Sequence, residues 1–390
     1  MHLPPQRWTI LVMLFVSRTG LGLQFQTLGS VSDQLLEVFD FGFTEIGSLV
    51  GAFFLSGLVF AVPAGFVGRY ATDKTLVATG LVALAVGGAL AAVATGFGMF
   101  ATARMICGIG FVLTTIYFTK MVTDWFTGKE LATAMAVLVM SWPFGIAIGQ
   151  IGYVWLAELF NWRIPFLVAS VYCALGAVSV WVIYRAPGGA INAIQSTSWG
   201  LPRSELVLTI FASGVWALFN AAYIVYLSFA PRVLIDGGYG PVGAAATVSM
   251  ASWVFLFSGI LCGQLADRFG RSDVILYVCL AVGTCTLLLL TFTEAAVALC
   301  LVFGLFGIAP AGIIMSLTVQ AMSPQHRAFG MGLFFVGYFL LQAPAPGIAG
   351  WLFDMSGDPY SAIVFAAFLF LLAGLCNFGF RRTQKRLEVL

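Results

Sequence analysis

The chain has 390 residues, of which 61% are hydrophobic and only 9% are charged, with a formal net charge of +2. Soluble domains carry about 25% charged residues, so this composition excludes a soluble globular protein. With so few charges the net charge says nothing about a partner, and a nucleic-acid partner is not expected. A helical protein that crosses a membrane many times is expected.

Apolar stretches long enough to span a bilayer, roughly 20 residues each, follow one another along the whole chain. No cleavage site of small residues follows the first stretch, which is therefore predicted to be a transmembrane helix and not a signal peptide. The fold class expected is an all-α membrane protein with twelve transmembrane helices. They are predicted at 8–31, 44–67, 75–95, 98–122, 131–156, 164–185, 205–230, 242–264, 274–292, 296–320, 328–353 and 360–380.

One connection between these stretches is longer than the others and is rich in Gly, Ser and Pro. Residues 186–204 are predicted to be a cytoplasmic linker between an N-terminal six-helix half, 1–185, and a C-terminal six-helix half, 205–390. The loop GFVGRYATDK (65–74) has a counterpart in GQLADRFGRS (263–272), at an offset of 198 residues. Two pseudo-symmetric halves are expected, with a substrate site near the membrane midplane between them.

Positive charge is distributed unevenly between the two sets of loops. With the N-terminus inside, 14 of the 18 Lys and Arg residues lie on the cytoplasmic side. Only Arg163 and Arg232 lie outside, and the remaining two lie within the spans. Because cytoplasmic loops carry the excess of positive charge, both termini are predicted to be cytoplasmic. The short loops favour a bacterial inner membrane, and a monomer in the lipid bilayer is expected.

The two arginines within the spans, Arg18 and Arg104, have no acidic residue at comparable depth. A charge near the bilayer centre costs about 2.5–3.5 kcal/mol on insertion scales, so it usually faces a cavity or a partner. A cavity that binds an anion is expected, because a guanidinium matches a carboxylate. The alternative for Arg18 is a bond to backbone carbonyls or to a lipid headgroup. The alternative for Arg104 is helix packing or gating.

Uncharged polar and aromatic residues are further candidates for the wall of this cavity. The 198-residue offset carries Arg18 onto Trp216, and the C-terminal half has no charge at this depth. Ligand sites commonly combine apolar walls with a few polar groups, although aromatic residues at helical spacing usually pack. The predicted substrate-binding residues are Arg18, Arg104, Gln26, Trp142, Trp216, Asn220, Tyr223, Tyr338 and Gln342. The Gly/Pro-rich stretches 143–149, 307–312 and 343–350 are expected to allow close packing and bending.

Several absences narrow the function further. The sequence contains no P-loop, zinc-ligand spacing, HExxH or GxSxG motif, so no enzyme, metal or cofactor is expected. The seven cysteines are expected to be buried packing residues. No Asp or Glu lies at mid-span, and His2 and His326 lie at the cytoplasmic edge. Conventional proton coupling therefore has no evident carrier, which favours uniport or exchange.

Several motifs resemble those of the major facilitator superfamily, over essentially the whole chain. GQLADRFGR (263–271) is similar to its loop signature, RMICGIG (104–110) to its fourth helix and NWRIPF (161–166) to the entry of its sixth helix. The resemblance implies the major facilitator fold with alternating access. It also implies a gating role for the loop residues Gly263, Asp267, Arg268 and Arg271.

A finer resemblance is to the cyanate/nitroimidazole-type permeases. It rests on Arg18, on QTLGSVSDQL (26–35) and on the segment 120–147. In the first-half loop, Arg69 stands at the position of the family aspartate, so Asp73 is a candidate substitute.

These observations predict a secondary active or facilitative transporter of a small organic or inorganic anion, which works by uniport or exchange through alternating access. A broad-specificity drug or metabolite exporter is the first alternative, and lipophilic cations would compete for its cavity. A lipid flippase and a non-transporting membrane receptor are further alternatives.

Overall fold

The computed structural model describes residues 6–68, 70–126, 130–187, 200–291, 295–323 and 326–388. All regular elements within these ranges are helices, which confirms the all-α fold class. Residues 188–199 of the predicted linker lie outside the described ranges, and so does Arg69.

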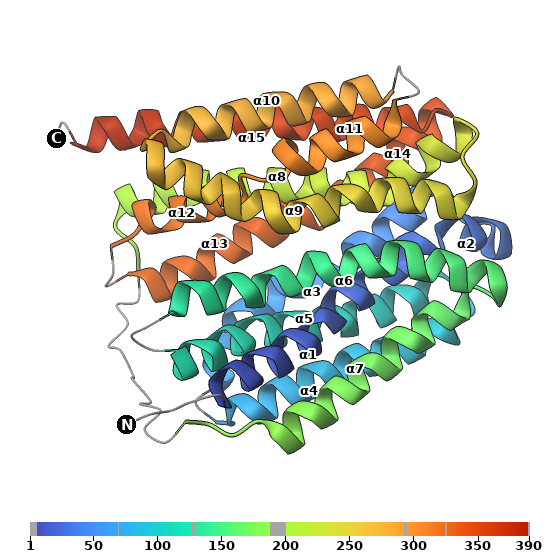
Figure 1. The fold of residues 1–390 in the computed structure, drawn as a ribbon, viewed down its shortest axis with the longest axis horizontal. Coiled ribbons are helices and arrows are strands. Elements are labelled where there is room, and N and C mark those ends of the chain that lie inside the picture. Colours follow the sequence, from blue (N-terminus) through green and yellow to red (C-terminus); the bar gives the residue numbers. More distant parts are fainter. Residues whose placement is uncertain are drawn as a thin grey trace. The chain divides into compact units, whose positions relative to one another are not determined.

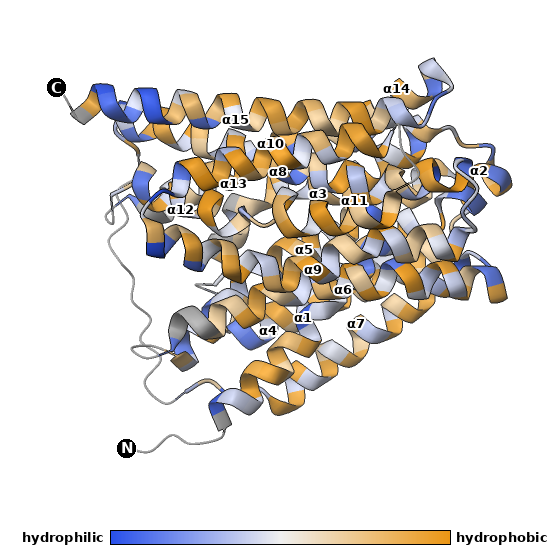
Figure 2. Ribbon diagram, turned by 45° about the horizontal axis from the view of Figure 1, so that its top comes forward, coloured by the Kyte–Doolittle hydropathy of each residue, from blue (hydrophilic) through white to orange (hydrophobic). Residues whose placement is uncertain are grey.

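Twelve helical segments in the described part of the chain are long and apolar enough to cross a membrane, as predicted. The first nine correspond to α1 (Gln6–Ser30), α3 (Phe43–Val67), α4 (Asp73–Ala92), α5 (Phe97–Phe126), α6 (Leu131–Leu159), α7 (Arg163–Ile183), α8 (Arg203–Asp236), α9 (Pro241–Phe269) and α10 (Ser272–Leu290). The twelfth is α15 (Tyr360–Glu388). Figure 2 shows hydrophobic residues along the helices and hydrophilic ones at the C-terminal end of α15 and on α2 (Ser32–Phe39), a short helix that was not predicted.

The ends of several helices follow from their terminal residues. The Thr72 side chain accepts a hydrogen bond from the Thr75 backbone N–H at 3.3 Å and so caps the start of α4. Pro241, whose φ suits a first turn, opens α9. Gly270 and Gly357 end α9 and α14 in the left-handed conformation, with φ of 62° and 65°, which glycine adopts without steric cost.

Two transmembrane segments are interrupted. The tenth consists of α11 (Ala296–Val302), the π-helix η1 (Phe303–Gly307) and α12 (Ala311–Ala321), and the eleventh consists of α13 (Arg327–Gln342) and α14 (Ala345–Ser356). Both interruptions fall in Gly/Pro-rich stretches that were expected to allow bending. The third such stretch, 143–149, lies within the uninterrupted helix α6.

The chain divides into two compact units. The first comprises Met1–Phe39 and Ala52–Ala193, and the second comprises Asp40–Gly51 and Ile194–Leu390. The first turns of α3 therefore belong to the second unit, although the rest of this helix belongs to the first. Within the first unit α4 lies beside α7, and within the second α10 lies beside α15 (Figure 1).

The seven cysteines are all free thiols, and five of them are buried as expected. Cys285 is exposed and Cys376 is half-buried, so the packing prediction is wrong for Cys285. Its position on α10 turns it away from the interior of the unit, a direction that the apolar sequence of α10 does not reveal.

Candidate functional site

Arg18 lies on α1 with only 7% of its surface exposed, and it binds the neighbouring helix α6. Its Nη1 donates hydrogen bonds to the carbonyl oxygen of Leu138 at 2.9 Å, to that of Val139 at 3.4 Å and to Ser141 Oγ at 2.9 Å. Pro143 explains why one of these carbonyls, that of Val139, is available. Proline has no N–H, so the carbonyl four residues earlier, that of Val139, has no helical donor.

The remaining edge of the Arg18 guanidinium is without a partner. Nε is fully buried and has no hydrogen bond among the described residues, and none of the hydrogen bonds of this side chain uses Nη2. The Nε and Nη2 donors lie side by side and match the two oxygens of a carboxylate. Arg18 thus binds backbone carbonyls, as the alternative for this residue predicted. Its other edge is free and has the geometry to bind an anion.

Arg104 differs from Arg18 because its guanidinium is engaged on α1. It is 1% exposed, and its Nη1 and Nη2 donate to the carbonyl oxygens of Gln24 at 3.1 Å and Phe25 at 3.2 Å. Its guanidinium carbon also lies 4.7 Å from the ring centroid of Phe53. Arg104 therefore ties α5 to α1, which agrees with the alternative of helix packing.

The candidates Trp142 and Gln26 lie near these arginines but are committed to other contacts. The Trp142 ring packs against Phe111 and Phe25, with ring centroids 4.9 and 5.4 Å apart. The Gln26 amide donates to Ser30 Oγ at 3.2 Å within α1. Trp142 thus belongs to an aromatic cluster between helices of the first unit, and Gln26 is 2% exposed.

In the second unit, three of the predicted residues come together. The rings of Trp216 and Tyr338 lie 6.4 Å apart, between α8 and α13. Asn220 Nδ2 donates to the Trp216 carbonyl oxygen at 2.8 Å, one turn along α8. Trp216 and Asn220 are partly exposed, so their side chains are accessible.

The other two residues predicted to bind substrate in the second unit lie in different surroundings. The Tyr223 hydroxyl is hydrogen-bonded to Ser252 Oγ on α9 at 2.8 Å, so it is engaged by a neighbouring helix. Gln342 is fully buried at the end of α13, and neither its Oε1 nor its Nε2 has a partner among the described residues. An unpaired buried amide costs about 1–3 kcal/mol, so Gln342 needs a partner more than the other predicted site residues of this unit do.

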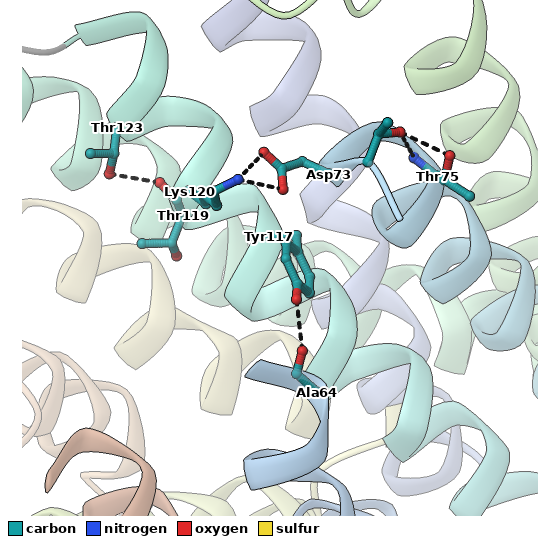
Figure 3. A network of polar contacts seen from close by, with 8 residues as sticks. Ala64, Asp73, Thr75, Tyr117, Thr119, Lys120 and Thr123 are labelled. Carbon is teal, nitrogen blue, oxygen red and sulfur yellow. Dashed lines mark hydrogen bonds and ion pairs between the residues drawn. The ribbon is translucent and has the colours of Figure 1, made fainter. Parts of the chain in front are cut away.

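The loop residues that the resemblance assigned to gating are at the surface. Asp267, Arg268 and Arg271 are exposed, and Gly263 is half-buried. In the first-half loop, Asp73 receives both of its ionic hydrogen bonds from Lys120 Nζ, at 2.8 and 2.7 Å (Figure 3). Asp73 therefore joins the start of α4 to the end of α5.

A second bond stabilises the same end of the first unit. The Tyr117 hydroxyl on α5 donates to the carbonyl oxygen of Ala64 on α3 at 2.7 Å (Figure 3). This carbonyl belongs to the last four residues of α3, whose C=O groups have no donor within the helix, so the tyrosine supplies one.

Reasoning from sequence did not find the groups that bind Arg18, which are the Ser141 hydroxyl and two carbonyls of α6. The signal that could have found them is Pro143, four residues after Val139. Across the described part of the chain, His, Cys, Asp and Glu do not gather in groups of three or more that could hold a metal ion.

Twelve apolar segments in the described part of the chain, two of them carrying buried arginines, define a polytopic helical membrane protein. The family model described as Major Facilitator Superfamily matches residues 10–343, so the chain belongs to that superfamily.

Relatives of known name agree with this family. The "Hexuronate transporter" of Bacillus subtilis (strain 168) is 23% identical over 369 residues, which cover 87% of this chain and 86% of the relative. Among solved structures, a bacterial homologue of the human lysosomal transporter Spinster, inward-facing and occupied, has a TM-score of 0.78 at 17% identity and covers 98% of both chains. The nucleoside transporter NupG has a TM-score of 0.76 at 14% identity and covers 97% of this chain and 100% of its own. These similarities establish the fold, and the protein is a membrane transporter of the major facilitator type.

Proposed function

We propose that this protein transports a small organic anion and that Arg18 binds the anionic group. The observation that carries the proposal is the free Nε/Nη2 edge of a guanidinium that is 7% exposed. Holding a charge at this depth is costly, and three bonds to α6 use only one of its nitrogens. A carboxylate on the free edge would satisfy the remaining donors.

The chemistry of a named relative supports an organic anion over an inorganic one. Hexuronates, the substrates in the name of the Bacillus subtilis relative, combine one carboxylate with several hydroxyls. In our proposal Arg18 of the first unit binds the carboxylate. Trp216, Asn220, Tyr338 and Gln342 are proposed separately as substrate-contacting residues of the second unit. Arg104 has a positioning role, because it holds α1, the helix that carries Arg18.

The finer features of the predicted transporter remain part of this proposal. They are uniport or exchange, a monomer, an inner-membrane location with cytoplasmic termini, and kinship with the cyanate/nitroimidazole-type permeases. The balance of 14 cytoplasmic Lys and Arg residues supports the orientation.

The test compares ligand-induced thermal stabilisation of the purified protein with that of two arginine variants. The ligands are a hexuronate, its neutral methyl ester, a simple carboxylate and a lipophilic cation. Ligand binding to the folded state raises the melting temperature. We expect stabilisation by the hexuronate and not by its ester. In Arg18→Lys, which keeps the charge but not the paired donors, the dissociation constant should rise by about tenfold to a hundredfold.

The control is Arg163→Lys, because Arg163 is exposed and its guanidinium contacts the Trp162 ring. This variant should bind the hexuronate as the parent does. Hexuronate binding that is indifferent to Arg18→Lys would remove Arg18 from the site. Stabilisation by the lipophilic cation alone would favour the exporter alternative. Uptake into proteoliposomes then separates a transporter from a protein that only binds.

A further inference from the structure

The N-terminal end of α3 is bound by a carboxylate from a distant helix of the same unit. Asp354 accepts hydrogen bonds from the backbone N–H of Phe43 at 2.9 Å and from that of Thr44 at 2.7 Å. The Thr44 hydroxyl donates to the same carboxylate at 2.5 Å. The start of a helix leaves backbone N–H groups without internal partners, and a carboxylate stabilises them and the positive end of the helix dipole.

Asp354 does not serve its own helix in this way. It lies in the last turn of α14, where a negative charge is unfavourable to the helix dipole. Its stabilising contacts are all at the start of α3, more than 300 residues earlier in the chain. This placement indicates that the carboxylate is used to hold α3 and not to stabilise α14.

Beneath this cap, α3 and α14 approach each other through their backbones. A Cβ placed on Gly47 would overlap the carbonyl oxygen of Pro346, and one placed on Gly350 would overlap that of Phe43. Small residues allow such contacts between transmembrane helices, with Cα–H donors facing carbonyl oxygens. The rings of Phe43 and Phe353 also stack, with centroids 3.7 Å apart.

The position of this contact along α3 relates it to the movement that transport requires. Residues up to Gly51 cluster with the second unit, and those from Ala52 on cluster with the first. Alternating access moves one half of such a transporter against the other. A single helix that belongs to both units must either bend near Gly51 or release one of its contacts. Weak Cα–H contacts and exposed polar bonds can be released at a small cost.

We propose that Asp354 is a gating residue of the transport cycle. Its carboxylate holds the N-terminal end of α3 on α14 in one state, and loss of the three hydrogen bonds lets this end of α3 separate from α14 in the other. The proposal concerns movement and not recognition, so it does not rest on the substrate or on the role of Arg18.

The test measures how often α3 leaves α14, by the reactivity of a thiol placed in the contact. Ser48 is half-buried on α3, with its Oγ 3.0 Å from where a Cβ on Gly347 would lie. Ser48→Cys is made in the full-length protein, purified in detergent, and labelled with a water-soluble maleimide. The protein without Ser48→Cys is labelled in parallel, which subtracts the reaction of exposed Cys285. No substrate is needed.

Adding Asp354→Asn should raise the labelling rate by roughly three- to tenfold, because the cap and its charge are weakened. Thr44→Val removes only the hydroxyl bond and should raise the rate by less, and it tests the cap with a smaller perturbation of folding. An unchanged rate in both variants would overturn the proposal.

The matched control is Asp358→Asn. Asp358 is a neighbouring carboxylate that accepts the Tyr360 N–H at 2.9 Å at the start of α15 and makes no bond to α3. It should leave the labelling rate unchanged. An equal rise in Asp358→Asn would mean that any lost cap loosens this region, and Asp354 would then have no specific gating role.

Discussion

Two proline-containing transmembrane segments, α6 in the first unit and the eleventh segment in the second, differ in continuity. In the first unit, α6 runs from Leu131 to Leu159 without interruption although it contains Pro143. In the second unit, the eleventh segment is interrupted after Gln342, where Pro344 and Pro346 follow. Proline removes a backbone donor wherever it stands, so the difference has to be sought in what surrounds each helix.

A buried cation distinguishes the two surroundings. Arg18 crosses from α1 and donates to carbonyl oxygens in the turn that Pro143 disturbs. Among the described residues of the second unit, no charged side chain is buried, so no comparable donor is available there. In α6 a buried charge thus accompanies a helix that stays continuous through its proline, whereas the eleventh segment is interrupted. Since α8 also stays continuous through Pro231, the contrast concerns these two segments and not the units as wholes. The same cation retains an edge for a ligand.

The largest effect is expected where α1 and α6 meet, because this contact holds Arg18 against α6. A Cβ on Gly22 would overlap the carbonyl oxygen of Trp142 and would lie 2.9 Å from the backbone nitrogen of Ile146. Both atoms are backbone, so the helices must separate. We expect Gly22→Ala to lower the free energy of unfolding by about 3 kcal/mol, measured by denaturant titration in detergent.

The control for Gly22→Ala is Gly152→Ala on α6, because a Cβ there would have no neighbour within 4 Å. Alanine is the better helix former, so this variant should be neutral or slightly stabilising. Equal losses in the two variants would mean that the α1–α6 contact is not tightly packed. The repeat offset places Asn220 of the second unit at the position of Gly22, so the close contact is not repeated there by sequence.

Much of the fold could be predicted because the membrane imposes it on the sequence locally. Each span needs its own run of apolar residues, and the twelve predicted runs correspond to the observed segments. Helix α2 was missed, since an eight-residue helix has no such run. The division of α3 between the units was missed as well, because it depends on glycines and a carboxylate that are brought together from distant parts of the chain.

The site could be predicted only to the level of single residues. The depth of Arg18 in the first span indicated that it needs a partner, but its position relative to Ser141 depends on how α1 crosses α6. The same local signal, an arginine within a span, led to the prediction of substrate contact for Arg104. The structure distinguishes the two arginines by which nitrogens are occupied, and no sequence pattern records this.

A smaller effect is expected when Arg104 loses its paired donors. Arg104→Lys keeps a buried charge but cannot reach the carbonyl oxygens of Gln24 and Phe25 with two nitrogens of one planar group. We expect a loss of about 2 kcal/mol in the free energy of unfolding, since fewer bonds offset the burial of the charge. Arg18→Lys should cost less stability, because a single ammonium can replace Nη1 while the free edge contributes nothing to the fold. A larger loss in Arg18→Lys would contradict the assignment of separate roles.

The smallest effect on the free energy of unfolding is expected when a serine-to-carbonyl hydrogen bond is removed. One such bond from each unit serves for the comparison. Ser56 Oγ donates to the carbonyl oxygen of Met105 in α5 at 2.7 Å, and Ser258 Oγ donates to that of Gly304 in η1 at 2.6 Å. Both serines are 2% exposed, so burial does not separate them. The carbonyl in the continuous helix has a helical donor, whereas π-helical backbone bonding is less regular.

Ser258→Ala should therefore cost about 1 kcal/mol, and Ser56→Ala less than half of that. Amide hydrogen exchange provides the local measurement. Peptides that cover η1 should exchange faster in Ser258→Ala, whereas peptides around Met105 should change little in Ser56→Ala. If the two variants respond equally, the π-helix is as rigid as an ordinary helix. The second unit would then have to change shape at its other interruption, between α13 and α14, where the described residues offer Gln342 no partner.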